Sequence, residues 1–226
     1  MVPSLIMTEK GPVEICTGFP AGENDGLAFG IDTSDPAYQP IYTQKRTLER
    51  FAATGGSVSL ALFRKRIIIG YAVIGSPSAD SRWAKARCRK ILELKGIEVA
   101  RHFRSQGIAG RLMTHLFSGA AHDDRIVILS AFAWLWDIAH TGMPCDVYRN
   151  MLTNLYAGFG FESFQTNEPN VCLKPENIFM TRIGKNISTK DRERFKWLRF
   201  GILTPHRDGL CGKTVENSEK NSYVTE

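Results

Sequence analysis

The chain has 226 residues, of which 43% are hydrophobic and 10% aromatic, and its formal net charge is +6. This composition supports one globular domain with a sizeable core and is too apolar for a disordered chain. No run of eighteen apolar residues is present, and the first residues lack a basic stretch followed by an apolar one, so neither a membrane span nor a secretion signal is expected. The sequence predicts a cytoplasmic protein.

The five cysteines lie far apart, without a C-x-x-C pair. An odd, scattered set is typical of buried or incidental thiols in a reducing compartment. The histidines show no metal-ligand spacing, so no metal site is predicted.

Much of the positive charge lies between Arg82 and Lys90. This segment is either a solvated helix face or a basic surface for a polyanionic cofactor or an acidic partner. No zinc finger, ribonucleoprotein motif or basic zipper accompanies the charge, so nucleic-acid binding is poorly supported.

The first half of the chain predicts one helix among several strands. A stretch rich in Gly, Asp and Pro, ending at Pro40, is expected to be irregular. Apolar spacing favours a helix over 43–54, ended by Gly55 and Gly56. Strands are expected over 13–19, 57–63, 66–75 and 91–99, and the basic turn 64–66 makes the middle two a hairpin.

From Gly107 the apolar residues change to helical spacing, with Ile108, Leu112 and Leu116 four residues apart. The elements expected further along the chain are a buried strand over 125–136, a helix over 145–161 that stops at Gly158 or Gly160, short strands about 161–164 and 177–183, and a helix over 189–200.

This order predicts one α/β domain with a mixed sheet over 1–203, followed by a polar, disordered tail over 204–226. The long hairpins argue against a purely parallel, doubly wound sheet.

The segment 97–112, IEVARHFRSQGIAGRL, joins an expected strand to an expected helix. The N-terminus of a helix has unpaired N–H groups and a partial positive charge, and small residues at Gly107, Ala109 and Gly110 let an anion approach them. Arg104 and Arg111 add charge, and the fork of Arg104 suits phosphate oxygens. A pyrophosphate is therefore the expected ligand, although the Walker A and G-x-G-x-x-G patterns are absent.

Arg104-x-x-Gly107-x-Ala109 matches the R/Q-x-x-G-x-G/A loop of the GNAT acetyltransferase superfamily, which the chain resembles. The resemblance implies the GNAT fold, a central mixed, mostly antiparallel sheet flanked by helices, with this loop between the fourth strand and a helix. It also implies acetyl-CoA as co-substrate. The residues expected to bind it are Val99, Ala100, Arg104, Ser105, Gln106, Gly107, Ile108, Ala109, Gly110 and Arg111.

A narrower resemblance, to the acetoin-utilization (AcuA-type) acetyltransferases, runs from about Leu92 to Phe200 and is loose over the first ninety residues. The matching stretches are IEVARHFRSQGIAGRLM, WLWDIAHTGMPCDVYR and MTRIGKNIS, with WLRF after them. The pattern W-x-W-D-x-x-x-x-G-M-x-x-D-V is the most distinctive, since GNAT enzymes in general lack it. Members of that family acetylate the active-site lysine of AMP-forming acetyl-CoA synthetase and inactivate it, so the resemblance implies that partner.

Acetyl transfer to an amine needs a base, because an ammonium group is not a nucleophile. Glu98 is the first candidate, since it lies on the strand that leads into the loop. Alternation along one strand leaves open whether Glu98 faces the cleft or the solvent, and Glu93 is a weaker alternative. A backbone N–H near Val99 is the expected oxyanion donor. The resemblance implies that Tyr156 places its hydroxyl near the CoA sulfur, and a packed core tyrosine is the alternative.

Asp137 follows Trp134 and Trp136 at the end of a strand, where indole walls and a carboxylate would receive a lysine. The alternative is that both tryptophans are core and Asp137 caps the strand end. Asp146 is expected to contact the substrate or to cap a helix.

Two other functions remain open. One is N-acetylation of a small amine, such as a polyamine or an aminoglycoside. The other is a non-catalytic acyl-CoA sensor that keeps the fold and binds the co-substrate without transfer. The sequence does not predict the acyl chain length or the oligomeric state.

Overall fold

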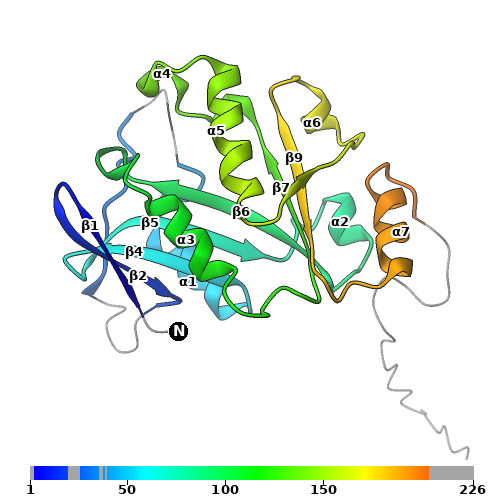
Figure 1. Cartoon of the computed structure of the whole chain (residues 1–226), viewed down its shortest axis with the longest axis horizontal. Coiled ribbons are helices and arrows are strands. Elements are labelled where there is room, and N and C mark those ends of the chain that lie inside the picture. Colours follow the sequence, from blue (N-terminus) through cyan, green and yellow to red (C-terminus); the bar gives the residue numbers. More distant parts are fainter. Residues whose placement is uncertain (1–2, 20–25, 36–37, 39, 204–226) are drawn as a thin grey trace, which may run out of the picture.

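The structure, a computed structural model, describes residues 3–19, 26–35, 38 and 40–203. The expected tail over 204–226 and part of the irregular stretch before Pro40 lie outside the described residues. Within them, the strands form one sheet in the order β1-β2-β4-β5-β6-β7-β9-β8, with β3 beside β5 (Figure 1). Their bounds are β1 Ser4–Thr8, β2 Gly11–Thr17, β3 Ala28–Phe29, β4 Ser57–Phe63, β5 Ile67–Gly75, β6 Ile91–Val99, β7 Ile126–Ala131, β8 Glu162–Ser163 and β9 Ile178–Ile183.

Neighbouring strands are antiparallel except for β6 with β7 and β3 with β5, which are parallel. The predicted mixed, mostly antiparallel sheet is therefore confirmed, as is the helix directly after the glycine loop. The helices are α1 Lys45–Ala53, α2 Arg82–Lys85, α3 Ile108–Leu116, α4 Ile138–Thr141, α5 Cys145–Ala157, α6 Pro169–Cys172 and α7 Thr189–Leu198. Among the described residues, none of these helices has the length and apolar character that a membrane crossing requires.

The sheet has helices on both faces, and β5 shows why. Gly70 faces α3, where a Cβ would lie 3.3 Å from Leu112 Cδ1 and 3.0 Å from the Glu98 carbonyl oxygen. The next residue, Tyr71, points to the other face and packs against Tyr42. The glycine lets α3 approach the strand closely, which fixes the loop before α3 relative to the end of β6.

Strands β6 and β7 pair over only a short length. Ile91–Glu93 of β6 lies beside Ile126–Ile128 of β7, whereas β6 remains paired with β5 as far as Val99. The two parallel strands therefore diverge towards their carboxyl ends. The apolar run predicted as a strand over 125–136 ends as a strand at Ala131, because its later apolar side chains line the opening between the strands instead of continuing the sheet.

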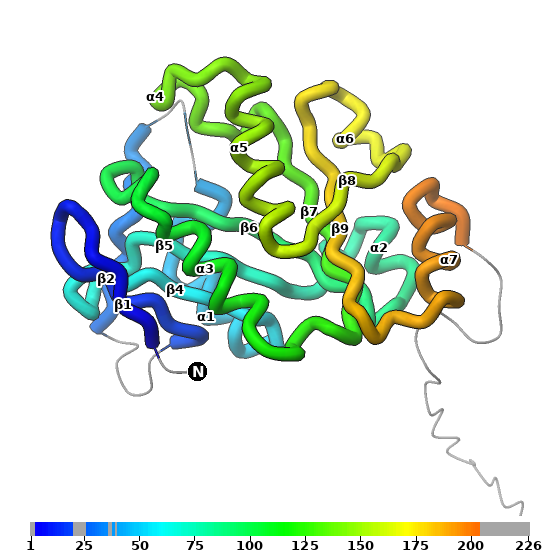
Figure 2. The backbone as a smooth tube through the Cα atoms, in the orientation of Figure 1, coloured from blue at the N-terminus to red at the C-terminus, as the bar shows by residue number. Residues whose placement is uncertain are grey.

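The basic segment is partly structural. Trp83 of α2 is buried and stacks on Phe179, with ring centroids 5.5 Å apart. Arg82 Nε lies 2.7 Å from a Glu168 carboxylate oxygen, and Lys90 Nζ lies 2.7 Å from Asp191 Oδ2 at α7. These side chains join α2 to β9 and to the start of α6, and the segment before β6 to α7, at the far end of the sheet from the β1–β2 hairpin (Figure 2). The segment is therefore not solvated throughout, because Trp83 is buried.

Strand β1 was not predicted. It pairs with β2 through the turn before Gly11, and its Leu5 and Met7 are exposed while Ile6 packs on the core. Because Leu5, Ile6 and Met7 are all apolar, the segment lacks the alternation of apolar and polar residues on which a strand prediction depends.

Candidate active site

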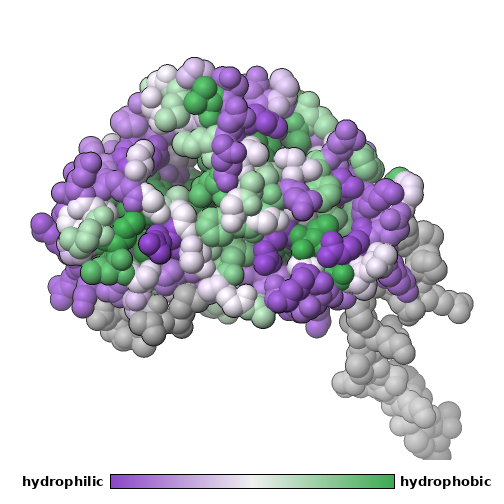
Figure 3. All heavy atoms as spheres, viewed as in Figure 1, coloured by the Kyte–Doolittle hydropathy of each residue, from purple (hydrophilic) through white to green (hydrophobic). Residues whose placement is uncertain are grey.

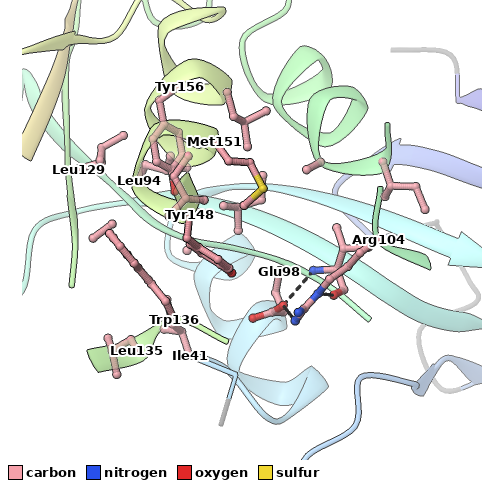
Figure 4. Close-up of a pocket in the computed structure, with 18 of the residues that line it drawn as sticks. Ile41, Leu94, Glu98, Arg104, Leu129, Leu135, Trp136, Tyr148, Met151 and Tyr156 are labelled. Atoms are coloured by element: carbon pink, nitrogen blue, oxygen red, sulfur yellow. Dashed lines mark hydrogen bonds and ion pairs between the residues drawn. The ribbon is translucent and has the colours of Figure 1, made fainter. Parts of the chain in front are cut away.

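A pocket of about 510 Å³ lies where β6 and β7 diverge. The loop before α3, the ends of both strands and one face of α5 line it. Figure 4 shows Glu98 and Arg104 on one side of it and Leu135, Trp136 and Ile41 on another. In the space-filling view the surface is hollowed between α3 and the region of α4 and α5 (Figure 3).

The loop opens the N-terminus of α3 to this pocket. Gly107 has φ +79° at the N-cap, and the first intrahelical bond runs from the Arg111 N–H to the Gly107 carbonyl at 3.1 Å. The amides of residues 108–110 therefore precede the hydrogen-bonded turn. A Cβ on Gly110 would lie in open space, with no heavy atom within 4 Å. An anion can approach these amides, and the partial positive charge of the helix end favours it.

Seven of the ten residues expected to bind the co-substrate line this pocket, and their binding role stays a prediction. The seven are Val99, Arg104, Ser105, Gly107, Ile108, Ala109 and Gly110. Ala100, Gln106 and Arg111 are not among the lining residues. The Gln106 side chain instead accepts a hydrogen bond from the Glu9 N–H at 2.9 Å, which ties the loop to the β1–β2 turn.

Glu98 faces the pocket and is only 8% exposed. Its Oε1 accepts hydrogen bonds from the Val99 N–H and from Arg104, both at 3.1 Å, and its Oε2 accepts one from the Tyr38 hydroxyl. Burial raises the pKa of Glu98, and the bonds from Tyr38 and Arg104 oppose the shift without cancelling it. Of the two orientations that the sequence left open, the structure has the one toward the cleft.

Of the two backbone amides at the end of β6, that of Val99 faces the carboxylate of Glu98. The Ala100 N–H is bonded to the Ile69 carbonyl at 2.7 Å, within the sheet. The Val99 N–H therefore donates to Glu98 Oε1 in this arrangement, and its role as the oxyanion donor stays a prediction.

Asp137 is almost completely buried, with 1% of its surface exposed. Arg101 donates to it from Nε and from a terminal nitrogen, both at 2.8 Å, and Arg104 donates at 2.5 Å. Burial opposes ionisation of Asp137, but these hydrogen bonds outweigh it and lower its pKa. The carboxylate expected to receive a lysine is therefore already engaged by two arginines, and its contact with a lysine stays a prediction.

The two tryptophans of the WLWD segment differ in position. Trp136 lines the pocket and stacks on Tyr148, with ring centroids 5.4 Å apart. Trp134 is 46% exposed and does not line the pocket, although Phe132, on which it stacks, does. Asp146 is exposed in the first turn of α5, where its carboxylate interacts favourably with the partial positive charge of the helix N-terminus. Only Trp136 of these three reaches the pocket.

Two tyrosines from one face of α5 enter the pocket. Tyr156 and Tyr148 are eight residues apart, so they lie on the same side of the helix. Burial raises the pKa of each hydroxyl, which keeps both protonated at neutral pH. Figure 4 shows Tyr148 reaching toward Glu98 and Tyr156 further along the pocket.

Sequence reasoning missed Tyr148, Tyr38 and Arg101. The four-residue spacing of Tyr148, Leu152 and Tyr156 on α5 could have indicated the first. Tyr38 lies in an irregular stretch without any periodic signal, and its ring covers the guanidinium groups of Arg101 and Arg104 at 5.3 and 5.5 Å. In the described part of the chain, no three His, Cys, Asp or Glu side chains gather as metal ligands would.

No family model matches the chain. It is 29% identical to the acetoin utilization protein AcuA of Bacillus licheniformis over 196 residues, 86% of this chain and 92% of that protein. The AcuA protein of Bacillus subtilis is 29% identical over 183 residues, 80% of this chain and 86% of that protein. The crystal structure of an acetoin utilization protein from Exiguobacterium sibiricum matches with a TM-score of 0.78 at 26% identity, over 88% of this chain and 94% of that one.

These matches span the sheet, the loop and the pocket rather than one segment. The mixed, mostly antiparallel sheet and the loop between β6 and α3 agree with the fold that the loop motif implied. In sequence over most of its length and in three-dimensional structure, the chain is similar to the acetoin utilization proteins AcuA.

Proposed function

We propose that the chain is an N-acetyltransferase that transfers the acetyl group of acetyl-CoA to a lysine side chain of a protein. The acceptor we propose is the active-site lysine of an AMP-forming acetyl-CoA synthetase, which would lose its activity. The reaction would take place in the cytoplasm. The observation that carries the proposal is a single pocket in which the open N-terminus of α3, the carboxylate of Glu98 and the hydroxyl of Tyr156 meet.

The pocket fits acetyl-CoA by its chemistry. The amides of residues 108–110 and the end of the α3 dipole suit a pyrophosphate, and Gly110 leaves room for it. Apolar side chains along the rest of the pocket, among them Ile108, Leu129, Leu152 and Leu155, suit an aliphatic arm. Bound there, acetyl-CoA supplies the acetyl group as a thioester.

The residues of the chain would act on the acceptor as follows. Glu98 takes a proton from the lysine ammonium, which must be neutral to attack a carbonyl carbon. An incoming amine meets Glu98 at Oε2, which accepts one hydrogen bond, from Tyr38, whereas Oε1 accepts two, from Arg104 and Val99. The raised pKa of Glu98 makes it a stronger base than an exposed glutamate.

Two further groups would act on the acetyl carbonyl and on the leaving sulfur. The Val99 N–H would shift its hydrogen bond from Glu98 Oε1 to the carbonyl oxygen and stabilise the negative charge that develops there. As the C–S bond breaks, the Tyr156 hydroxyl, kept protonated by burial, would donate its proton to the departing thiolate, and the acetylated nitrogen would return its surplus proton to Tyr156.

The test is mass spectrometry of purified acetyl-CoA synthetase after incubation with the chain and acetyl-CoA. The loop variant Gly110→Glu places a carboxylate where the pyrophosphate would lie and should abolish acetylation. Gly26→Glu adds the same charge at another glycine with open space around it and should leave acetylation intact.

The expected result is acetylation of one synthetase lysine together with loss of synthetase activity. A panel of free polyamines and aminoglycosides is incubated in parallel. Acetylation of these amines and not of the synthetase would show that the acceptor is a small amine and not a protein lysine. Binding of acetyl-CoA without any transfer would identify a sensor.

A further inference from the structure

We propose that Arg104, the arginine of the loop motif, positions and ionises Glu98 instead of binding the pyrophosphate, and that Asp137 and Arg101 hold Arg104 in this position. The proposal rests on the proposed function only in treating Glu98 as the base of the transfer. It assigns Arg104, Arg101 and Asp137 as positioning residues.

All three nitrogens of the Arg104 guanidinium have partners within the chain. Nε donates to the Val99 carbonyl at 2.9 Å, one terminal nitrogen to Asp137 at 2.5 Å, and the other to Glu98 at 3.1 Å. The Tyr38 ring covers the guanidinium. The fork geometry that suits two phosphate oxygens is thus already matched to two carboxylates.

The direction of the side chain supports the same conclusion. Arg104 turns back along β6 to the carbonyl of Val99, five residues earlier. Figure 4 shows its guanidinium beside Glu98. The amides of residues 108–110, which suit the pyrophosphate, are on the helical side of the loop.

Asp137 and Arg101 account for the fixed position of Arg104. Asp137 follows β7, whereas both arginines follow β6, so their hydrogen bonds cross the gap between the diverging strands. Arg101 is itself fixed by Asp35, at 2.8 Å. A buried carboxylate with two arginine partners keeps Arg104 charged and restricts its rotation.

Among the described residues, Arg104 supplies the positive charge that faces Glu98. The other groups that face it are the hydroxyls of Tyr38 before α1, Tyr71 of β5, and Tyr148 and Tyr156 of α5. Loss of Arg104 would therefore favour the protonated form of Glu98. The acid limb of kcat/KM would then move to higher pH.

The test uses the full chain with Arg104→Gln, Arg104→Lys and, as a matched control, Arg111→Gln. The control removes an equal charge from the first turn of α3 without a contact to Glu98. Calorimetry measures the Kd for acetyl-CoA, and NMR of the labelled Glu98 carboxyl follows its titration; neither measurement depends on turnover. Circular dichroism and thermal melting verify that each variant is folded.

We expect Arg104→Gln to keep the Kd for acetyl-CoA within about threefold of wild type and to raise the titration midpoint of Glu98 by about one pH unit or more. Arg104→Lys should return the midpoint toward wild type because it restores the charge, and Arg111→Gln should leave it unchanged. A larger loss of acetyl-CoA affinity in Arg104→Gln, or a Glu98 midpoint that does not move, overturns the proposal. A chain that binds acetyl-CoA and never transfers acetyl would refute the proposed function while leaving both readouts in place.

Discussion

Arg101 and Asp137 join two strands that have already separated. The guanidinium of Arg101, just beyond the end of β6, donates two hydrogen bonds of 2.8 Å to the carboxylate of Asp137, beyond the end of β7. Backbone pairing between these strands covers only three residue pairs at their other end. The side-chain bridge therefore sets the width of the pocket where strand pairing no longer does.

Asp137→Asn should destabilise the fold, because the amide cannot accept from two guanidinium groups as the carboxylate does. The expected loss in the free energy of unfolding is about 2 kcal/mol at neutral pH. The folded-state pKa of Asp137 is lowered, so its contribution is present above its unfolded pKa and is lost as pH falls. The difference between variant and wild type should therefore shrink as the pH falls below about 4.

Urea unfolding at several pH values measures this difference. Asp124→Asn is the control, since the Asp124 carboxylate is 60% exposed and lies 3.4 Å from Arg125. This substitution should lower the free energy of unfolding much less than Asp137→Asn does. Equal losses for the two variants would contradict a buried bridge.

Glu98→Gln should lower kcat/KM for the acceptor by about two to four orders of magnitude, as loss of a general base does. The affinity for acetyl-CoA should be unchanged, because the loop amides that suit the pyrophosphate do not contact Glu98. Steady-state kinetics and calorimetry separate the two effects. Glu93→Gln, which alters a carboxylate paired with Lys95, should leave kcat/KM near wild type; the opposite ranking would make Glu93 the base.

Tyr38→Phe should move the acid limb of kcat/KM to higher pH. The Tyr38 hydroxyl donates to Oε2 of Glu98 and lowers its pKa against the effect of burial. Without that hydrogen bond the pKa of Glu98 rises, so Glu98 becomes ionised, and the enzyme active, only at higher pH. A pH–rate profile over the acid range measures the limb, and a profile identical to wild type would show that the hydroxyl does not influence the base.

Tyr156→Phe should reduce kcat by about two orders of magnitude if its hydroxyl protonates the leaving thiolate. KM for acetyl-CoA should change little, because the ring remains to fill the same space. Tyr148→Phe is the matched comparison, since the two hydroxyls share one face of α5 and both line the pocket. A larger loss of kcat in Tyr148→Phe would transfer the role of the acid to Tyr148.

The sequence was sufficient for those features that depend on local pattern. The four-residue spacing after Gly107 and the hairpin around 64–66 predicted α3, β4 and β5, and the glycines of the loop predicted the open N-terminus of α3. These are effects of neighbouring residues, which a single sequence contains.

The rest depends on contacts between distant parts of the chain. Alternation along β6 could not assign the face of Glu98, because the decisive neighbours are Tyr38, 60 residues earlier, and the gap left by β7. The same holds for Asp137, whose expected partner was a lysine and whose observed partners are arginines 33 and 36 residues away. Complementary charges in a sequence do not specify which of them meet.

The short run of backbone pairing between β6 and β7 has a mechanical consequence. Strands β1 to β6 form one arm of the sheet, and β7, β9 and β8 form another; the backbone ladder between the arms is the run of Ile91–Glu93 against Ile126–Ile128. A rotation of one arm against the other would break the fewest backbone hydrogen bonds along this run, and the ion pairs of Asp137 at the opposite end would oppose it. A small rotation of one arm about this run would change the width of the pocket while every ladder inside each arm stayed intact.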